Sequence, residues 1–273
     1  MDRVDKVLHL VDRQGFGLEI GPSHSPIAPK KAGFNVEILD HANADQLREK
    51  YRAHGVNIEN IEEVDFVWQG EPLDELIGKP GAYDFIIASH VIEHAPDLIS
   101  FLVQCEKLLK PSGVLSLAIP DKRYCFDYFR WPSSTGEVLQ ASIERRTRHA
   151  PGVVFDYFSS AAKLGEMIAW SKELKGELKF VHALEVAIAA WHQSINTADY
   201  IDVHQWRFTP SSFRLILSDL TSLGLTGLAE LCGFGTAGCE FFVTLGKEKS
   251  DRPKYDRLQL AKSMIQEIAE GIA

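Results

Sequence analysis

The sequence predicts an α/β protein with a mostly parallel sheet, and two observations support this prediction. Residues 83–121 contain an apolar β-prone run, then apolar positions at helical spacing, then a second apolar run at 114–119. Strand, helix and strand in this order form a right-handed parallel crossover. Further strand-like runs precede this unit, and two more lie close together near the C-terminus.

The crossover helix has recognisable ends. Pro96 can occupy a first helical turn, and Asp97 supplies early negative charge. Lys110, Pro111 and Gly113 end the helix before the second strand begins. The apolar positions at helical spacing are Leu98, Phe101, Leu102, Cys105, Leu108 and Leu109. Ligands of open α/β sheets bind beyond the carboxyl ends of the strands, so we expect a site next to residues 89–90 and 121.

Five segments precede the crossover unit. Residues 3–13 have apolar positions on one helical face, which predicts a short lead-in helix. Residues 17–21 and 36–40 read as the first and second strands, with a two-proline turn after the first. Residues 44–54 predict a helix and residues 61–68 a third strand.

The strand pattern stops after the crossover unit. Three helical stretches are predicted around residues 136–148, 157–174 and 181–197, in a segment rich in aromatic side chains. Such an insertion predicts a helical lid with an apolar underside. The predicted domains are therefore a core of residues 1–121 and 200–250, a lid of residues 122–199, and a C-terminal helix within 251–273.

Core alternation resumes near the C-terminus. Thr209 and Pro210 are typical of a capped helix start. The strands near 227–232 and 240–245 are joined by so short a glycine-rich turn that they predict an antiparallel hairpin. Residues 255–272 predict a last amphipathic helix.

The composition limits the function. A formal charge of −9 and a pI near 5.6 argue against a general nucleic-acid-binding surface, which needs clustered Lys and Arg. The four cysteines lack CxxC spacing, which favours a reducing compartment. We find neither a membrane span nor a signal-peptide pattern, so we expect a cytoplasmic protein without membrane contacts. A homodimer is left open.

Five motifs carry a resemblance to a known family. They are LEIGPSHSP (18–26), VEILDH (36–41), YDFIIASHVIEHAPD (83–97), LLKPSGVLSLAIPD (108–121) and HQWRFTPSSF (204–213). Together with the seven predicted strands, these motifs give the chain a resemblance to the class I S-adenosylmethionine-dependent methyltransferases. Within that class, it resembles the small-molecule methyltransferases of types 11 and 12. The resemblance implies a Rossmann-like sheet, S-adenosylmethionine as cofactor and a small-molecule acceptor. It covers about residues 15–121 and 204–247, and not the lid.

The loop after the first strand matches the family pattern at Gly21 but differs from it at Ser23 and Ser25. Gly21 lets the backbone approach a ligand closely, and the resemblance places Glu19 near the amino-acid end of the cofactor, with Pro22 and Ser23 alongside. The family's Gly-x-Gly-x-Gly would have glycines where Ser23 and Ser25 stand. A dinucleotide site would need Gly-x-Gly-x-x-Gly leading into a helix that holds a pyrophosphate, and this loop lacks it.

The next two strand ends complete the expected cofactor site. Asp40 ends the second strand, where a carboxylate can accept hydrogen bonds from both ribose hydroxyls, and His41 follows. A turn or helix-cap role for Asp40 is the alternative. Trp68 and Gln69 occupy the region that flanks the adenine in this family, although Trp68 could equally be a core residue.

Residues 90–94, at the end of the fourth strand, can be interpreted in two ways. Residues 90–94 spell H-x-x-E-H, an inverted zinc-protease motif, which works only on a helix. Because the first His ends a strand and Pro96 follows closely, we predict no metal site here. In the family reading, Ser89 and His90 line the methionine, while Glu93 and His94 face the acceptor. His94 could instead cap the next helix.

Methyl transfer from a sulfonium needs alignment, exclusion of water and, for a hydroxyl or protonated amine, a base. Histidine suits that role near neutral pH. We predict His94 and His204 as catalytic candidates, with His149 and His182 as further histidines. Arg123, Tyr124 and His192 are predicted to contact the acceptor, together with Glu93. The alternatives that remain are a binding module without turnover, an NAD-type oxidoreductase and a zinc hydrolase.

Overall fold

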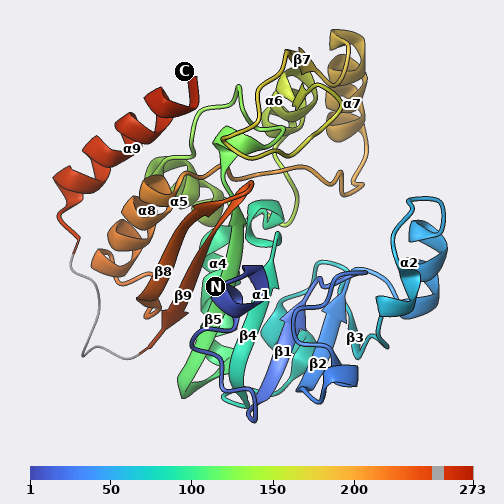
Figure 1. Ribbon diagram of the computed structural model, residues 1–273, viewed down its shortest axis with the longest axis vertical. Coiled ribbons are helices and arrows are strands. Elements are labelled where there is room, and N and C mark those ends of the chain that lie inside the picture. Colours follow the sequence, from blue (N-terminus) through green and yellow to red (C-terminus); the bar gives the residue numbers. More distant parts are fainter. Residues whose placement is uncertain (248–254, 273) are drawn as a thin grey trace.

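The computed structural model describes residues 1–247 and 255–272 (Figure 1). The described residues form a seven-stranded sheet in the order β3-β2-β1-β4-β5-β9-β8. β1 to β5 run parallel to one another, and β9 pairs antiparallel with both β5 and β8. The predicted mostly parallel sheet with a final hairpin is thus confirmed. The strands are β1 (Phe16–Ile20), β2 (Asn35–Asp40), β3 (Phe66–Val67), β4 (Tyr83–Ser89), β5 (Leu109–Pro120), β8 (Ala229–Ala237) and β9 (Glu240–Gly246).

Helices and short 3-10 turns connect these strands. The α-helices are α1 (Arg3–Val7), α2 (Ala44–Tyr51), α3 (Leu73–Ile77), α4 (Leu98–Leu108), α5 (Thr135–Ile143), α6 (Pro151–Ser160), α7 (Leu184–Asn196), α8 (Pro210–Ser222) and α9 (Arg257–Ile272). The 3-10 turns are η1 (Lys30–Ala32), η2 (Ile58–Asn60), η3 (Ile92–His94) and η4 (Lys122–Tyr124). None of the helices in the described ranges is long and apolar enough to cross a bilayer.

The sheet is buried on both faces because its apolar side chains alternate. In β5, Leu115 and Leu117 belong to the core under α4, α5 and α8, whereas Val114 and Ala118 belong to the core under α1. Successive side chains of a strand point to opposite faces, so a run of consecutive apolar residues fills both layers. This explains why the central strands lack a polar-apolar alternation in the sequence.

Two helix starts follow from local capping. Thr209 caps α8 as predicted, since its hydroxyl accepts a hydrogen bond from the Ser212 backbone N–H. Asp97 caps α4 by accepting from the Ser100 N–H at 3.0 Å, so Pro96 precedes the helix and does not lie in its first turn. The N-cap carboxylate satisfies a backbone donor that the helix itself leaves without a partner.

Several predicted elements have other lengths; the lead-in helix predicted over residues 3–13 ends at Val7, and the helix predicted over 136–148 ends at Ile143. The third strand spans only β3, because the Asp65 carboxylate, and not a further strand residue, accepts the Ile38 N–H at 2.7 Å. The predicted helix at 157–174 is wrong, since α6 ends at Ser160. The chain then forms a small antiparallel pair of β6 (Ala162–Leu164) and β7 (Leu178–Phe180). Ala162 and Leu164 are buried there with Trp170, a period-two pattern that the helical reading missed.

The insertion after β5 divides into two parts. α5 packs against α4 and α8, and its Val138 and Ala141 lie in the main core. α6 and α7 pack against each other and stand above the sheet with β7 (Figure 1). The structure therefore differs from the predicted lid of 122–199 by placing α5 in the core layer. Residues 248–254 and 273, at the predicted start and end of the C-terminal helix segment, lie outside the described residues.

Candidate active site

The residues predicted to bind the cofactor lie along one edge of the sheet. Parallel neighbouring strands present their carboxyl ends at the same edge, and β3, β2, β1 and β4 are adjacent in that order. The predicted positions at these four ends are Glu19, Gly21, Pro22, Ser23, Asp40, His41, Trp68, Gln69, Ser89 and His90.

Glu19 organises the loop after β1. Its buried carboxylate accepts backbone N–H groups of Ile27 at 2.7 Å and Ala28 at 3.0 Å, which fixes the far end of the loop. Gly21 has a φ of 65°, and a Cβ there would lie 3.2 Å from the Val91 side chain. A glycine is needed because other residues adopt this backbone conformation at a cost.

Burial raises the pKa of Glu19 to about 7, although the two N–H donors oppose the shift. Relative to a Glu19→Gln variant, the stability of the wild-type protein should therefore fall as pH rises from about 4.5 to 7. In this window only the folded state retains the proton, and the full difference amounts to about 3 kcal/mol. Urea unfolding of both proteins at pH 5 and pH 8 measures the effect. A difference that is independent of pH would contradict it.

Asp40 connects two loops at the end of β2. Only 2% of its surface is exposed, and its carboxylate accepts the Ser23 N–H at 2.9 Å and the His41 N–H at 2.8 Å. In the next loop, the Trp68 indole donates to the Glu71 carbonyl at 2.7 Å. Asp40 thus lies beside the glycine-containing loop, where the sequence predicted a ribose contact.

The end of β4 is held by an ionic network. The Ser89 hydroxyl accepts a hydrogen bond from Arg3 at 2.7 Å, and Arg3 pairs with Glu240 at 2.6 Å. Glu240 also bonds His90 Nε2 at 2.8 Å. Burial opposes protonation of His90, but the bond to Glu240 and the charge of Glu93 outweigh it and raise its pKa.

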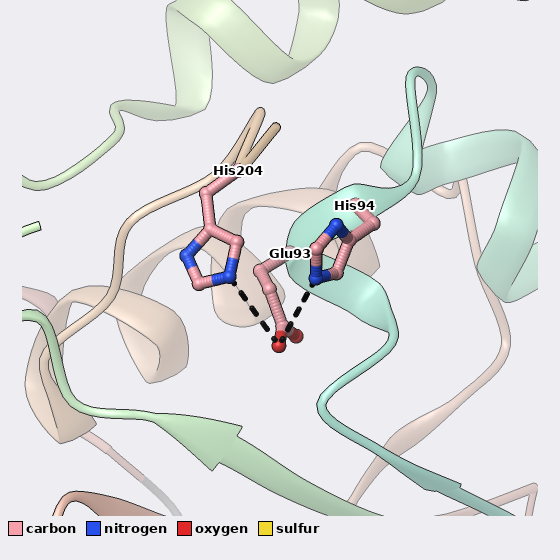
Figure 2. Close-up of side chains that lie close together, drawn as sticks. All are labelled: Glu93, His94 and His204. Carbon is pink, nitrogen blue, oxygen red and sulfur yellow. Dashed lines mark ion pairs between the residues drawn. The ribbon is translucent and has the colours of Figure 1, made fainter. Parts of the chain in front are cut away.

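Three side chains converge just beyond β4. Figure 2 shows Glu93 and His94 of η3 together with His204, which arrives from the segment before α8. The Glu93 Oε1 lies 3.9 Å from Nε2 of each histidine. Glu93 is 1% exposed, and neither of its carboxylate oxygens has a hydrogen-bond partner. We call these three residues the Glu93 cluster.

Each histidine of the cluster is anchored through its other nitrogen. His94 Nδ1 bonds Asp202 at 2.8 Å, so this ring does not cap α4, and His204 Nδ1 bonds Asp127 at 2.5 Å. Burial opposes ionisation of both carboxyl groups, but their histidine partners overcome it and lower the pKa of each to about 2. In a neutral ring, an Nδ1–H that donates to a carboxylate leaves the lone pair on Nε2. Burial opposes protonation of His94, but the bond to Asp202 and the charge of Glu93 outweigh it and raise its pKa.

A backbone strap holds His204 in place. The Glu93 carbonyl accepts the N–H groups of Gln205 at 2.7 Å and Trp206 at 3.1 Å. The buried Trp206 indole also donates to the Ala95 carbonyl at 2.7 Å. The His-Gln-Trp sequence therefore fastens its segment to η3 and brings His204 to the cluster.

The insertion forms an aromatic wall around His204. The Phe126 ring centroid lies 4.5 Å from that of His204, and Tyr157 of α6 lies 6.3 Å away. The Tyr200 hydroxyl donates to the His94 carbonyl at 3.2 Å. Burial raises the pKa of Tyr157 to about 12. The insertion thus lines one side of the cluster with aromatic rings.

The structure does not bring the remaining predicted acceptor residues to the cluster. Arg123 is buried in a bidentate pair with Asp121, at 2.9 and 2.6 Å, and reaches the α9 carbonyl of Glu267. Tyr124 packs beside the small sheet of β6 and β7. His192 is exposed on α7. Their acceptor contacts stay predictions.

The cluster also bears on the H-x-x-E-H motif. His90 has a φ of 55° and precedes the three-residue turn η3, so no α-helix carries the motif, as the sequence indicated. Nevertheless, Glu93 and His94 converge with His204, and their ligand atoms all lie within 4.8 Å of one another, a group that could hold a metal ion. Sequence spacing could not reveal this group, because His204 is distant along the chain. Asp127 and Asp202 were missed for the same reason.

Comparison with known proteins gives one family match and several more distant similarities. A family model described as a methyltransferase domain matches residues 3–172. The ubiquinone biosynthesis O-methyltransferase of Xanthomonas oryzae pv. oryzae is 24% identical over 183 residues, which are 67% of this chain and 71% of that protein. The squalestatin hexaketide synthase of a Phoma species is 30% identical over 82 residues, 30% of this chain, and the chain spans only 3% of that protein.

Among solved structures, an S-adenosylmethionine-dependent methyltransferase from Aquifex aeolicus is 13% identical, with a TM-score of 0.42 over 89% of this chain and 88% of that one. The family match extends over more than half of the chain and includes the loop after β1, the end of β2 and η3. The chain therefore belongs to the methyltransferase domain family and is a class I S-adenosylmethionine-dependent methyltransferase.

Proposed function

We propose that this enzyme transfers a methyl group from S-adenosylmethionine to a hydroxyl oxygen of a small molecule, and that this oxygen lies at the Glu93 cluster. The single observation that carries the proposal is the convergence of His94 and His204 on a buried carboxylate directly beyond the end of β4. An O-methyltransferase among the relatives supports oxygen as the acceptor atom.

The cofactor would lie across the ends of β1, β2 and β4. Asp40 would accept hydrogen bonds from the ribose hydroxyls, and the loop at Gly21 would allow close approach of the methionine. Trp68 and Gln69 would flank the adenine. This assignment is supported by the common edge on which these residues stand.

The reaction is an in-line displacement at the methyl carbon. A lone pair of the acceptor oxygen forms the new C–O bond while the C–S bond breaks. The electron pair of the C–S bond stays on sulfur, which becomes the neutral thioether of S-adenosylhomocysteine. The hydroxyl proton would pass to the Nε2 of His94 or His204, since Nδ1 of each ring is bonded to a carboxylate. Positioning of this kind contributes on the order of 7 to 11 kcal/mol, and a base about 10²- to 10⁴-fold in rate.

The surroundings of the cluster suit a small aromatic or apolar acceptor. Phe126 and Tyr157 line one side of His204, and both come from the insertion.

Family membership favours an enzyme that turns over its substrate, and disfavours the alternatives of a binding module, an oxidoreductase and a hydrolase. The four cysteines are free thiols, which supports the predicted cytoplasmic location.

Methyl transfer should be directly observable with cofactor that carries a deuterated methyl group. We expect the purified chain, incubated with a panel of phenols, alcohols and amines, to yield a labelled O-methyl product and one S-adenosylhomocysteine per product, measured by mass spectrometry. Binding of the cofactor without a product from any hydroxyl compound would contradict the proposal. Labelled products from amines alone would contradict the choice of oxygen.

A further inference from the structure

We propose that Glu93, His94 and His204 bind a divalent transition-metal ion, of which zinc is the representative. The inference deepens the proposed function, because the ion would lie where the acceptor oxygen is placed. Metal binding itself can nevertheless be tested without methyl transfer.

The positions of the donor atoms support a shared ligand. Glu93 Oε1 lies between the two histidines, 3.9 Å from each Nε2 (Figure 2). Zinc bonds of 2.0 to 2.1 Å in a tetrahedral arrangement place neighbouring ligand atoms about 3.4 Å apart. The two Glu93–histidine separations would need to shorten by about 0.5 Å to reach this spacing, and the separation of the two histidine nitrogens, which is within 4.8 Å, by up to about 1.4 Å.

The buried carboxylate of Glu93 accepts no hydrogen bond from the described residues, and His90 Nδ1 also lies 3.9 Å from its Oε1. Both oxygens are inaccessible to solvent and accept no hydrogen bond among the described residues. Burying an ionised carboxylate without a hydrogen bond or a cation is costly, so such groups are generally paired or bound to metals. Here the strap of residues 205–206 bonds the Glu93 backbone carbonyl, and the Glu93 carboxylate lies 3.9 Å from Nε2 of His94 and of His204, which is the environment of a metal ligand.

Nδ1 of each histidine is bonded to a carboxylate, which leaves Nε2 as the nitrogen that would bind the metal. His94 donates to Asp202 and His204 to Asp127, and Asp127 is held in turn by Arg130 at 2.8 Å. A carboxylate that accepts the distal N–H of a ligating histidine orients the ring and makes it a better ligand. Two such pairs directed at one carboxylate distinguish this group from histidines that merely fill a core.

The donor set also indicates the chemistry. Two imidazole nitrogens and one carboxylate oxygen suit zinc and related first-row ions rather than calcium or magnesium. Three protein ligands leave a coordination position free, which could take the acceptor oxygen and lower its pKa. With the ion bound, the Nε2 lone pairs of His94 and His204 would serve as ligands, so the ion would favour loss of the acceptor proton in place of a histidine base. The His94 side chain is 31% exposed, so an ion and an acceptor can reach the cluster.

The test uses the full chain after removal of metal by a chelator. Calorimetric titration with Zn²⁺ should show one equivalent bound, and Co²⁺ should give the visible absorption of a low-symmetry site. At free Zn²⁺ about 100-fold above its Kd, the Tm should rise by roughly 5 to 10 °C. Glu93→Gln and His204→Gln should lose all three responses, whereas His54→Gln, which alters an exposed histidine near α2, should retain them.

Two further measurements keep this result separate from the proposed function. His94→Gln changes the most exposed ligand and tests the site if the other variants do not fold. Titration of the metal-free chain with S-adenosylhomocysteine reports cofactor binding independently. The inference is overturned if Zn²⁺ binds wild type and Glu93→Gln equally, or binds neither, while cofactor binding is intact.

Discussion

His204→Gln should lower kcat of methyl transfer by roughly 10²- to 10⁴-fold while leaving the Kd for S-adenosylhomocysteine within about twofold of wild type. His204 Nε2 faces Glu93 at 3.9 Å, and its loss removes one of the two acceptors available to the hydroxyl proton. The glutamine retains a polar group near Asp127 and so limits structural damage. Single-turnover kinetics and calorimetry measure the two quantities.

The matched control is His54→Gln, which should keep the wild-type rate because His54 is exposed and remote in sequence from the Glu93 cluster. The double variant of His94 and His204 should lose little more activity than the worse single variant, since groups that act as a unit are not additive. If His204→Gln had the kcat of wild type, His204 would have no role in the methyl-transfer step, which would contradict the proposed mechanism.

Asp40→Asn should weaken S-adenosylhomocysteine binding by about 10- to 150-fold for each ribose hydrogen bond that loses its charge-assisted character. The range corresponds to roughly 1.5 to 3 kcal/mol per bond to a charged group. The asparagine keeps one oxygen that can accept the Ser23 or the His41 N–H, so the loops should stay close to their wild-type positions. Calorimetric titration measures the change.

Asp45→Asn provides the control, because Asp45 is exposed on α2 and pairs with Arg48. Its cofactor affinity should equal that of wild type. Thermal unfolding of Asp40→Asn separates a loss of binding from a loss of stability. An unchanged affinity in a folded Asp40→Asn protein would show that Asp40 has only the structural role of joining two loops.

The fold was predictable because its strongest signals are local. The apolar runs of β4 and β5 and the spacing of α4 between them follow from burial on both faces of the sheet. Thr209 likewise marks the start of α8 by its own hydrogen bond. The strand after α6 was missed, because β6 is only three residues long and packs against residues distant in sequence, such as Tyr124 and Tyr128.

The candidate site was predictable only in part. Asp40 ends β2 and Glu93 follows β4, and the ends of these strands share an edge, so their neighbourhood could be inferred from strand order alone. The partner Asp127 comes from the insertion and Asp202 from the segment before α8, and no repeating pattern relates them to His204 and His94. Tertiary folding creates that relation, and a single sequence does not encode it as spacing.

A crystal structure with bound S-adenosylhomocysteine tests the central claim most directly. The account predicts that the ribose hydroxyls contact Asp40, that the adenine lies near Trp68, and that the sulfur faces the Glu93 cluster with room for an acceptor between them. The account would be contradicted by a ligand whose sulfur points away from Glu93, or by one bound at another edge of the sheet.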